Sequence, residues 1–239
     1  MKQEIAILMA AGLGNRMLPL TESIPKPLVS VHGTPLIETM IHGLQKRNVN
    51  KIYIVVGYKK EQFHYLREKY CEVEIVENKE YSIKNNISSI YAVRNLLGEN
   101  NCFICESDIY VKNSDIFLAE LLSSCYYGKM VTGFSDDWIF ETKNKRITKI
   151  KKGGADVYNM TGIAYLHKAD ARLLKNRINE IYDSPGSNQM FWDEVVDSLL
   201  KQLYMEIHEV EAEDLIEIDT IEELAAIDSN YLVNGKSGD

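Results

Sequence analysis

Short apolar runs alternate with amphipathic stretches through the first half of the chain. The runs at residues 5–9, 51–56, 73–76 and 102–106 have the length and the flanking turn residues of buried β-strands. Between them, apolar residues recur every three or four positions, as in helices, over residues 36–44, 59–70 and 87–94. Strands that alternate with helices in this way predict a Rossmann-like α/β fold, a doubly wound and mostly parallel sheet with right-handed crossovers.

Local signals place the ends of two of these helices. Thr34 and Pro35 are expected to be the N-cap and the first residue of the helix over 36–44. Gly98 is expected to end the helix that begins near residue 87.

The pattern changes near residue 130, where a C-terminal elaboration of the sheet begins. Short strands at 130–134, 146–150 and 160–167 are expected around a turn at Gly153-Gly154. The remaining elements are expected to be helices at 169–181 and 189–200, a strand at 204–210, and a closing helix at 220–231 with Thr220 as its N-cap. We predict one domain over residues 1–232 and a frayed tail over 233–239.

Composition narrows the class of protein. The chain has 239 residues, 45% of them hydrophobic and 26% charged, which is typical of a folded globular domain. A net charge of −8 argues against a nucleic-acid partner. No apolar run approaches the ~20 residues that a membrane span needs. The four cysteines are expected to be reduced core thiols, which suits a cytoplasmic protein.

Charge is distributed unevenly along the chain. Nine carboxylates and no Lys or Arg lie between Glu206 and Leu224, whereas Gly14 to Lys69 holds nine basic residues against four acidic ones. Solvated surface explains both stretches. The alternative is a basic N-terminal face for phosphates and an acidic C-terminal segment that meets a metal.

A glycine-containing loop follows the first strand directly. The strand runs into Ala10-Ala11-Gly12-Leu13-Gly14-Asn15-Arg16. Glycines there let backbone N–H groups approach an anion, and the carboxyl end of a parallel sheet is where ligands bind. The spacing is neither a dinucleotide fingerprint nor a Walker loop. We expect nucleotide phosphates at Ala10, Ala11, Gly12 and Gly14, with a simple tight turn as the alternative.

Two cations lie at the ends of this loop region. Arg16 offers a bidentate fork and Lys26 a point charge, both suited to a triphosphate. Pro25 and Pro27 restrict the backbone on both sides of Lys26. We expect Arg16 and Lys26 to be catalytic, and solvated loop cations are the alternative.

An acidic residue ends the fourth predicted strand. Asp108 follows residues 102–106 and Ser107, so it should project from the carboxyl edge of the sheet. A carboxylate there can hold Mg²⁺ against an α-phosphate. An Asx turn or a helix cap is the alternative.

The loop as a whole is a specific pattern, A-A-G-L-G-N-R-M-x-P-L-T-x-x-x-P-K-P-L. It resembles the signature loop of the nucleotidyltransferases that make sugar-nucleotides and related activated alcohols. The resemblance implies a Rossmann-like fold and a reaction in which an NTP and a phosphate monoester give an NDP-compound and pyrophosphate.

The resemblance also assigns the metal site. In this family an Asp at the end of the fourth strand binds the metal, which implies Asp108. A second ligand comes from late in the chain, where Asp219 matches, and simple helix capping is the alternative for it. The family often has D-x-D or G-D at the metal strand. Here Glu106 takes the first acidic place, where it either shares the metal through a water or faces solvent.

The segment Asn85-Asn86-Ile87-Ser88-Ser89 opens a predicted helix. Its polar groups, Asn86 and Ser88 above all, suit a base edge or a ribose, and ordinary capping is the alternative. In the family this segment lies over the base. The Asn-Asn-x-x-Ser form resembles the bacterial phosphocholine cytidylyltransferase branch, which implies CTP.

Both tryptophans lie beside carboxylates. Trp138 follows Asp136-Asp137, and Trp192 precedes Asp193-Glu194. Aromatic faces near acids suit a quaternary ammonium, so Trp138, Trp192 and Asp193 are candidates for acceptor binding, with core or surface aromatics as the alternative. The phosphocholine branch has Asp-Asn after its aromatic pair, where this chain has Asp193-Glu194.

The function implied by the resemblance is Mg²⁺-dependent transfer of CMP from CTP to phosphocholine, which gives CDP-choline and pyrophosphate. The same chemistry on a sugar 1-phosphate, phosphoethanolamine or an aminophosphonate is one alternative, and a non-catalytic nucleotide-binding module is another. Lys149, Lys151 and Lys152 are candidates for the acceptor phosphate, although a solvated basic strand end also explains them.

Overall fold

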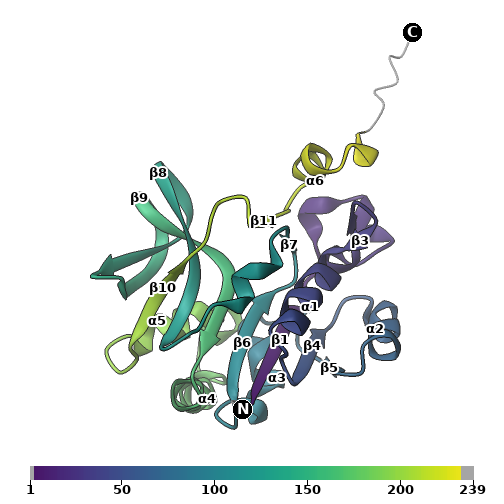
Figure 1. Ribbon diagram of the computed structural model, residues 1–239. Helices are drawn as coiled ribbons and strands as arrows, with labels where there is room; N and C mark the ends of the chain where they lie inside the picture. Colours follow the sequence, from purple (N-terminus) through teal and green to yellow (C-terminus); the bar gives the residue numbers. More distant parts are fainter. Residues whose placement is uncertain (1–2, 233–239) are drawn as a thin grey trace.

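A seven-stranded sheet forms the centre of the protein, whose computed structural model describes residues 3–232. The strand order is β10-β8-β9-β6-β1-β4-β5 (Figure 1). Its parallel half contains β1 (Glu4–Ala10), β4 (Lys51–Val56), β5 (Val73–Glu77) and β6 (Asn101–Glu106). The other half contains β8 (Ser124–Lys143), β9 (Arg146–Leu166) and β10 (Met205–Glu209), with β9 antiparallel to both β6 and β8. The predicted Rossmann-like α/β class is confirmed.

Helices cover both faces of the sheet. One apolar cluster joins alternate residues of β1, Ala6 and Leu8, to α1 (Leu36–Lys46) and α2 (His64–Lys69). The intervening residues of β1, Ile5 and Ile7, pack into a second cluster. That cluster contains side chains of α3 (Ile87–Ala92), α4 (Lys168–Ile181) and α5 (Trp192–Leu199). Burial on both faces explains why β1 is a continuous apolar run.

The predicted ends of two helices need correction. The predicted start of α1 is one residue too early: Pro35, and not Thr34, is the N-cap residue, and the two residues form β3, which pairs with β2 (Ser30–Val31) in a small hairpin before the helix. The helix that starts at Ile87 ends at Ala92, and a 3-10 turn follows it. Gly98 comes after that turn with a φ of 83°. A Cβ at Gly98 would lie 2.8 Å from Cβ of Arg172, so the glycine serves a close approach to α4.

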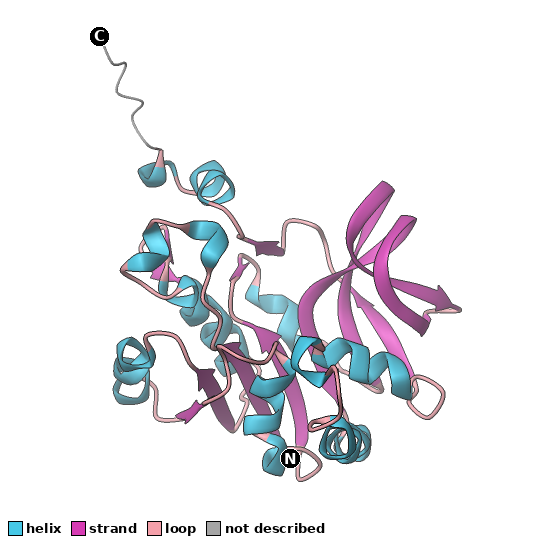
Figure 2. Cartoon of the chain, turned by 180° about the vertical axis from the view of Figure 1, so that it is seen from behind, coloured by secondary structure: helices cyan, strands magenta, loops and turns pink. Residues whose placement is uncertain are grey.

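The expected short strands after residue 130 are instead two long strands. β8 and β9 form one hairpin that stands out from the sheet (Figure 2). Its turn lies at Asn144-Lys145, whose φ values are 53° and 65°, and not at Gly153-Gly154 as predicted. Gly153, with a φ of 74°, lies opposite a bulge of β8, in which two residues, Asp136 and Asp137, oppose this single glycine. Bulges re-aim neighbouring side chains, and both aspartates line the main cavity described below.

The closing segment begins as predicted and is shorter. Thr220 caps α6 (Ile221–Ile227), and its Oγ1 accepts a hydrogen bond of 3.2 Å from the backbone N–H of Glu223. A 3-10 turn over Ser229–Tyr231 follows α6. The predicted tail over 233–239 lies outside the described residues.

All four cysteines are free thiols. Cys102, Cys105 and Cys125 are buried, as expected, whereas Cys71 is exposed after α2 and is not a core residue. None of the helices within residues 3–232 is long and apolar enough to cross a membrane.

A buried ion pair ties the first strand to the end of α1. The guanidinium of Arg47 donates two hydrogen bonds, of 2.6 and 3.0 Å, to the carboxylate of Glu4. It also donates to the carbonyl oxygens of Phe117 and Ala119, and Tyr165 donates its hydroxyl to Glu4 at 2.7 Å. Little more than a tenth of each charged side chain is exposed. Removal of one partner would leave the other charge desolvated and unpaired.

We therefore expect Arg47→Met to lower the free energy of unfolding by about 3 kcal/mol. Arg177→Met is the matched control, because Arg177 pairs with Glu180 on an exposed helix surface and should cost less than about 0.5 kcal/mol. Chemical denaturation of the two variants measures the difference. Equal losses would show that the Arg47–Glu4 pair contributes no more than a surface pair.

Candidate active site

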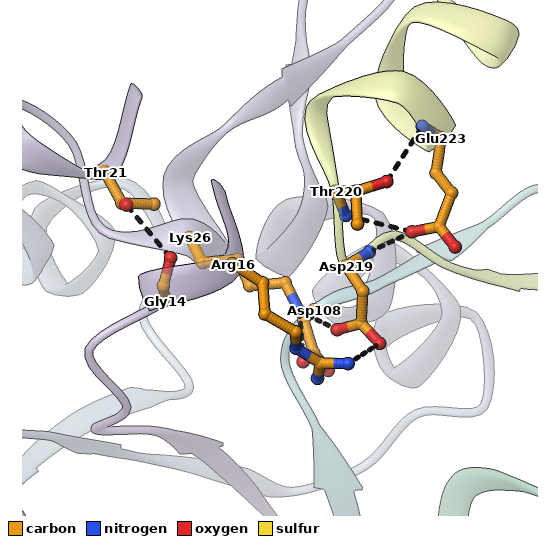
Figure 3. Close-up of polar contacts among 8 residues, drawn as sticks. All are labelled: Gly14, Arg16, Thr21, Lys26, Asp108, Asp219, Thr220 and Glu223. Atoms are coloured by element: carbon orange, nitrogen blue, oxygen red, sulfur yellow. Dashed lines mark hydrogen bonds and ion pairs between the residues drawn. The ribbon is translucent and has the colours of Figure 1, made fainter. Parts of the chain in front are cut away.

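The predicted phosphate loop leaves β1 at the point where the strand order of the sheet reverses. β4 pairs with β1 on one side and β6 pairs with it on the other. Open α/β sheets bind ligands at such a point. Gly14 has a φ of 67°, and a Cβ there would lie 3.0 Å from Thr21 and 3.1 Å from Lys26. Thr21 donates its hydroxyl to the Gly14 carbonyl at 2.9 Å, which folds the loop back on itself (Figure 3).

This loop delivers both predicted cations to the two predicted carboxylates. Lys26 Nζ lies 2.7 Å from Oδ2 of Asp108 and 2.5 Å from Oδ1 of Asp219. Arg16 Nη1 lies 2.6 Å from Oδ2 of Asp219 (Figure 3). Lys26 is buried, whereas the Arg16 side chain is 68% exposed. Four residues from three distant segments therefore meet at one point, as the sequence predicts.

The two carboxylates beside Lys26 have a larger effect on its pKa than burial has. Burial alone would lower the pKa of the Lys26 ammonium, but Asp108 and Asp219 raise it above its ordinary value. The ammonium is therefore charged at neutral pH and available to a phosphate group.

Two very short strands bring the carboxylates together. β7 (Ile109–Val111) begins directly after Asp108 and pairs antiparallel with β11 (Leu215–Glu217), which ends two residues before Asp219. The backbone N–H of Ile218 also donates to the Asp108 carbonyl at 3.2 Å.

The side chains of Asp108 and Asp219 do not serve in an Asx turn or a helix cap, the alternatives considered for them. The capping of α6 belongs to Thr220 and Glu223, whose carboxylate accepts from the backbone N–H groups of Asp219 and Thr220. The side chain of Asp219 is therefore free to meet Lys26 and Arg16. Oδ2 of Asp108 accepts from Lys26, and its Oδ1 is buried without a hydrogen-bond partner among residues 3–232.

A third carboxylate makes a metal site possible. One oxygen each from Asp108, Glu217 and Asp219 lies within 4.8 Å of the others. An all-oxygen set of this kind suits a hard divalent cation, and the unpartnered Oδ1 of Asp108 is one available ligand. Glu217 was not predicted as a ligand, although its position two residues before Asp219 in an extended segment was a usable signal.

A cavity of about 550 Å³ extends from this point, and a smaller one of about 240 Å³ adjoins it. Predicted site residues that line the larger cavity are Ala11, Gly12, Arg16, Asn86, Ser88, Asp108, Trp138, Asp193 and Asp219. Those that line the smaller one include Ala10, Gly14 and Lys26. The structure thus brings together every predicted site residue except Trp192.

The wall predicted to face the base is built by hydrogen bonds within the protein. The Asn86 side-chain oxygen accepts from the backbone N–H of Trp192 at 2.9 Å, which joins the start of α3 to the start of α5. Ser88 Oγ accepts from Asn78 and donates to the Asn85 carbonyl. These bonds hold the wall in shape, and base recognition by Asn86 and Ser88 stays a prediction.

Trp192 does not line either cavity. It is 3% exposed, and its ring stacks on Tyr126 with centroids 5.7 Å apart. The reason is the spacing of Trp192, Val195, Val196 and Leu199, which places all four on the buried face of α5. Phe191, one residue earlier, takes its place in the cavity and meets Trp138 edge-to-face at 5.5 Å.

Carboxylates surround this aromatic pair. Asp136, Asp137, Asp193 and Glu106 all line the cavity. Asp193 is 3% exposed and accepts a hydrogen bond of 2.9 Å from the Tyr126 hydroxyl. Burial raises the pKa of Asp193 to about 7. Burial, together with the nearby Asp108 and Asp193, raises the pKa of Glu106 well above its ordinary value. Entry of a cation would stabilise the charged forms of both groups.

Of the three lysines considered for the acceptor anion, Lys152 lines the cavity and the other two do not. Lys149 pairs with Asp197 and Lys151 with Glu141, so both belong to a basic strand surface. Lys152 lines the cavity, with its Nζ 5.6 Å from the centre of the Trp138 ring.

Comparison with known proteins agrees with this geometry. Residues 5–126 match the family model described as nucleotidyl transferase. The chain belongs to the nucleotidyl transferase family. It is 47% identical to a 2-aminoethylphosphonate cytidylyltransferase of Lancefieldella rimae, over 95% of this chain and 93% of that one. It is 33% identical to a choline-phosphate cytidylyltransferase of Streptococcus pneumoniae, over 91% and 94%.

A solved structure of the CTP:phosphocholine cytidylyltransferase of Streptococcus pneumoniae superimposes with a TM-score of 0.86 at 30% identity. The alignment covers 95% of this chain and 99% of that chain. The nucleotidyltransferase fold expected from the loop is therefore confirmed along nearly the whole length.

We expect Lys26→Met to lower kcat at least about 100-fold, because a preorganised charge at the reacting phosphates is lost. Lys60→Met is the control, since Lys60 pairs with Glu77 on the surface and should keep wild-type turnover. Pyrophosphate release and thermal melting measure turnover and folding for both variants. A folded Lys26→Met enzyme within about threefold of wild type would contradict the assignment.

Proposed function

We propose that the protein transfers CMP from CTP to 2-aminoethylphosphonate, with release of pyrophosphate. An aminophosphonate replaces phosphocholine, the acceptor expected first from the sequence. The relative that acts on 2-aminoethylphosphonate is 47% identical over nearly the full length, against 33% for the choline-phosphate relative. Both relatives are cytidylyltransferases, which supports CTP as the donor.

The main support for this proposal is the set of side chains around Trp138 and Phe191 in the larger cavity. A quaternary ammonium donates no hydrogen bond and is recognised by aromatic faces. A primary ammonium donates three hydrogen bonds and is best met by carboxylates. With Trp192 in the core, the aromatic residues that line the cavity are Tyr81, Trp138 and Phe191, while several carboxylates line the same cavity.

The chemistry needs positioning and charge neutralisation more than proton transfer. A phosphonate oxygen of the acceptor attacks the α-phosphorus of CTP, and the bond from that phosphorus to the bridging oxygen of the β-phosphate breaks. The phosphonate is already anionic at neutral pH, so no general base is required. Lys26 and Arg16 both contact Asp219 beside the phosphate loop. They would stabilise the negative charge that grows on the leaving pyrophosphate.

Asp108, Asp219 and Glu217 are the residues that would hold Mg²⁺. A bound Mg²⁺ would neutralise charge on the α-phosphate and favour attack there. In the described structure Lys26 balances the charge of two of these carboxylates, Asp108 and Asp219. Gly12 and Gly14 line the smaller cavity, where their backbone amides would bind the phosphates.

The direct test is a pyrophosphate-release screen of four nucleotides against a panel of acceptors. The panel contains 2-aminoethylphosphonate, phosphoethanolamine, phosphocholine and glucose 1-phosphate, and EDTA is the control for metal dependence. We expect CTP with 2-aminoethylphosphonate to give the highest kcat/KM, by at least about tenfold, and EDTA to abolish release. A preference for phosphocholine would overturn the acceptor assignment. Binding of CTP without pyrophosphate release from any acceptor would instead indicate a non-catalytic module.

A further inference from the structure

Glu106 has a place in the cavity that the proposed reaction does not yet use. It is the last residue of β6, beside Met9 of β1, and it lines the cavity together with Asp193. Across residues 3–232 its carboxylate has no hydrogen-bond or ion-pair partner, and its electrostatic neighbours include Asp108 and Asp193. A carboxylate in this setting is poised to accept hydrogen bonds from a ligand.

The neighbouring strand is shaped around this side chain. Gly162 of β9 has a φ of 77°, and a Cβ built there would lie 3.0 Å from Oε2 of Glu106 and 2.7 Å from Cδ1 of Ile109. A glycine is therefore needed for the Glu106 carboxylate to lie against β9. Gly162 itself lines the cavity, so the space opens on the side where the acceptor would bind.

Glu106 is separate from the candidate metal ligands. The carboxylate oxygens that converge within 4.8 Å belong to Asp108, Glu217 and Asp219. Glu106 lies outside this group although it precedes Asp108 by only two residues. Another acidic neighbour, Asp193, accepts a hydrogen bond of 2.9 Å from the Tyr126 hydroxyl, which helps to fix the orientation of that carboxylate.

We propose that Glu106 is a specificity-determining residue which, with Asp193, binds the primary ammonium group of the acceptor. Two carboxylates from different elements, β6 and α5, offer acceptors for at least two of the three N–H groups. A trimethylammonium group cannot donate to them. The inference rests on the proposed function and deepens it, because it explains how one cavity selects a primary amine over a quaternary one.

The test compares Glu106→Gln with wild type on 2-aminoethylphosphonate and on ethylphosphonate, which lacks the amine. KM is measured for the first, and the inhibition constant against it for the second. Glu106→Gln keeps the size of the side chain and removes its charge. We expect the affinity advantage of the aminated compound to fall at least about tenfold, since a charge-assisted hydrogen bond is lost. The KM for CTP should change by less than about threefold, because the proposal assigns Glu106 to the acceptor amine and not to the nucleotide.

Three further variants sharpen the result. Glu77→Gln is the matched control, because Glu77 ends the parallel strand β5 but pairs with Lys60 at the surface, so it should behave as wild type. Glu106→Asp keeps a carboxylate and should recover part of the advantage. Glu217→Gln, a change at a candidate metal ligand, should lower kcat without changing the ratio between the two compounds.

The outcomes separate the two proposals. If wild type uses 2-aminoethylphosphonate but Glu106→Gln weakens both compounds by the same factor, Glu106 does not read the amine, and the proposed function stands. If wild type uses phosphoethanolamine and not 2-aminoethylphosphonate, the acceptor assignment fails, and the role of Glu106 is decided by the same comparison with ethyl phosphate. If wild type prefers phosphocholine or shows no advantage for the amine, both proposals fail.

Discussion

The contact of one ammonium with two carboxylates determines how the site is organised. Lys26 comes from the loop after the first strand, Asp108 from the end of the fourth parallel strand, and Asp219 from the segment before the last α-helix. Their charges can meet only if the loop folds back at Gly14 and the short strands β7 and β11 pair. The contact therefore couples three parts of the chain to one point at the carboxyl edge of the sheet. The proposed reaction would take place at this edge, beside these fixed charges.

In the proposed function, fixed charges also bind the acceptor, but there carboxylates of the protein meet a cationic group of the ligand. On the proposed function, Lys26 and Arg16 would meet the triphosphate, and the carboxylates farther along the cavity would meet the amine of the acceptor. The bulge of β8 contains Asp136 and Asp137, which line the cavity, and the Tyr126 hydroxyl holds Asp193 there. A molecule that carries an anionic phosphonate and a cationic amine matches both ends of this arrangement. This complementarity would favour a primary amine over a quaternary one among acceptors that share a phosphoryl group.

The parts of the fold that repeat a simple pattern could be predicted from the sequence. The buried parallel strands are continuous apolar runs, and Gly14 and Asp108 follow the first and the fourth of them closely, so their place at the sheet edge could be predicted. The pairing of β7 with β11 was not, because strands of three residues carry no usable period. The hairpin turn was misplaced because Gly153-Gly154 is the stronger turn signal, whereas the structure uses those glycines inside β9. The neighbouring acids favour a binding role for Trp192, but its helical spacing with Val195 and Val196 places it on the buried face of α5.

The most direct test of this account is anomalous diffraction from crystals grown with Mn²⁺ and CTP. The account predicts one strong manganese peak bound by Asp108 and Asp219 beside the α-phosphate, with Lys26 Nζ within hydrogen-bond distance of a phosphate oxygen. A triphosphate bound away from the Gly12–Gly14 loop, or an ion held without Asp108 and Asp219, would contradict it.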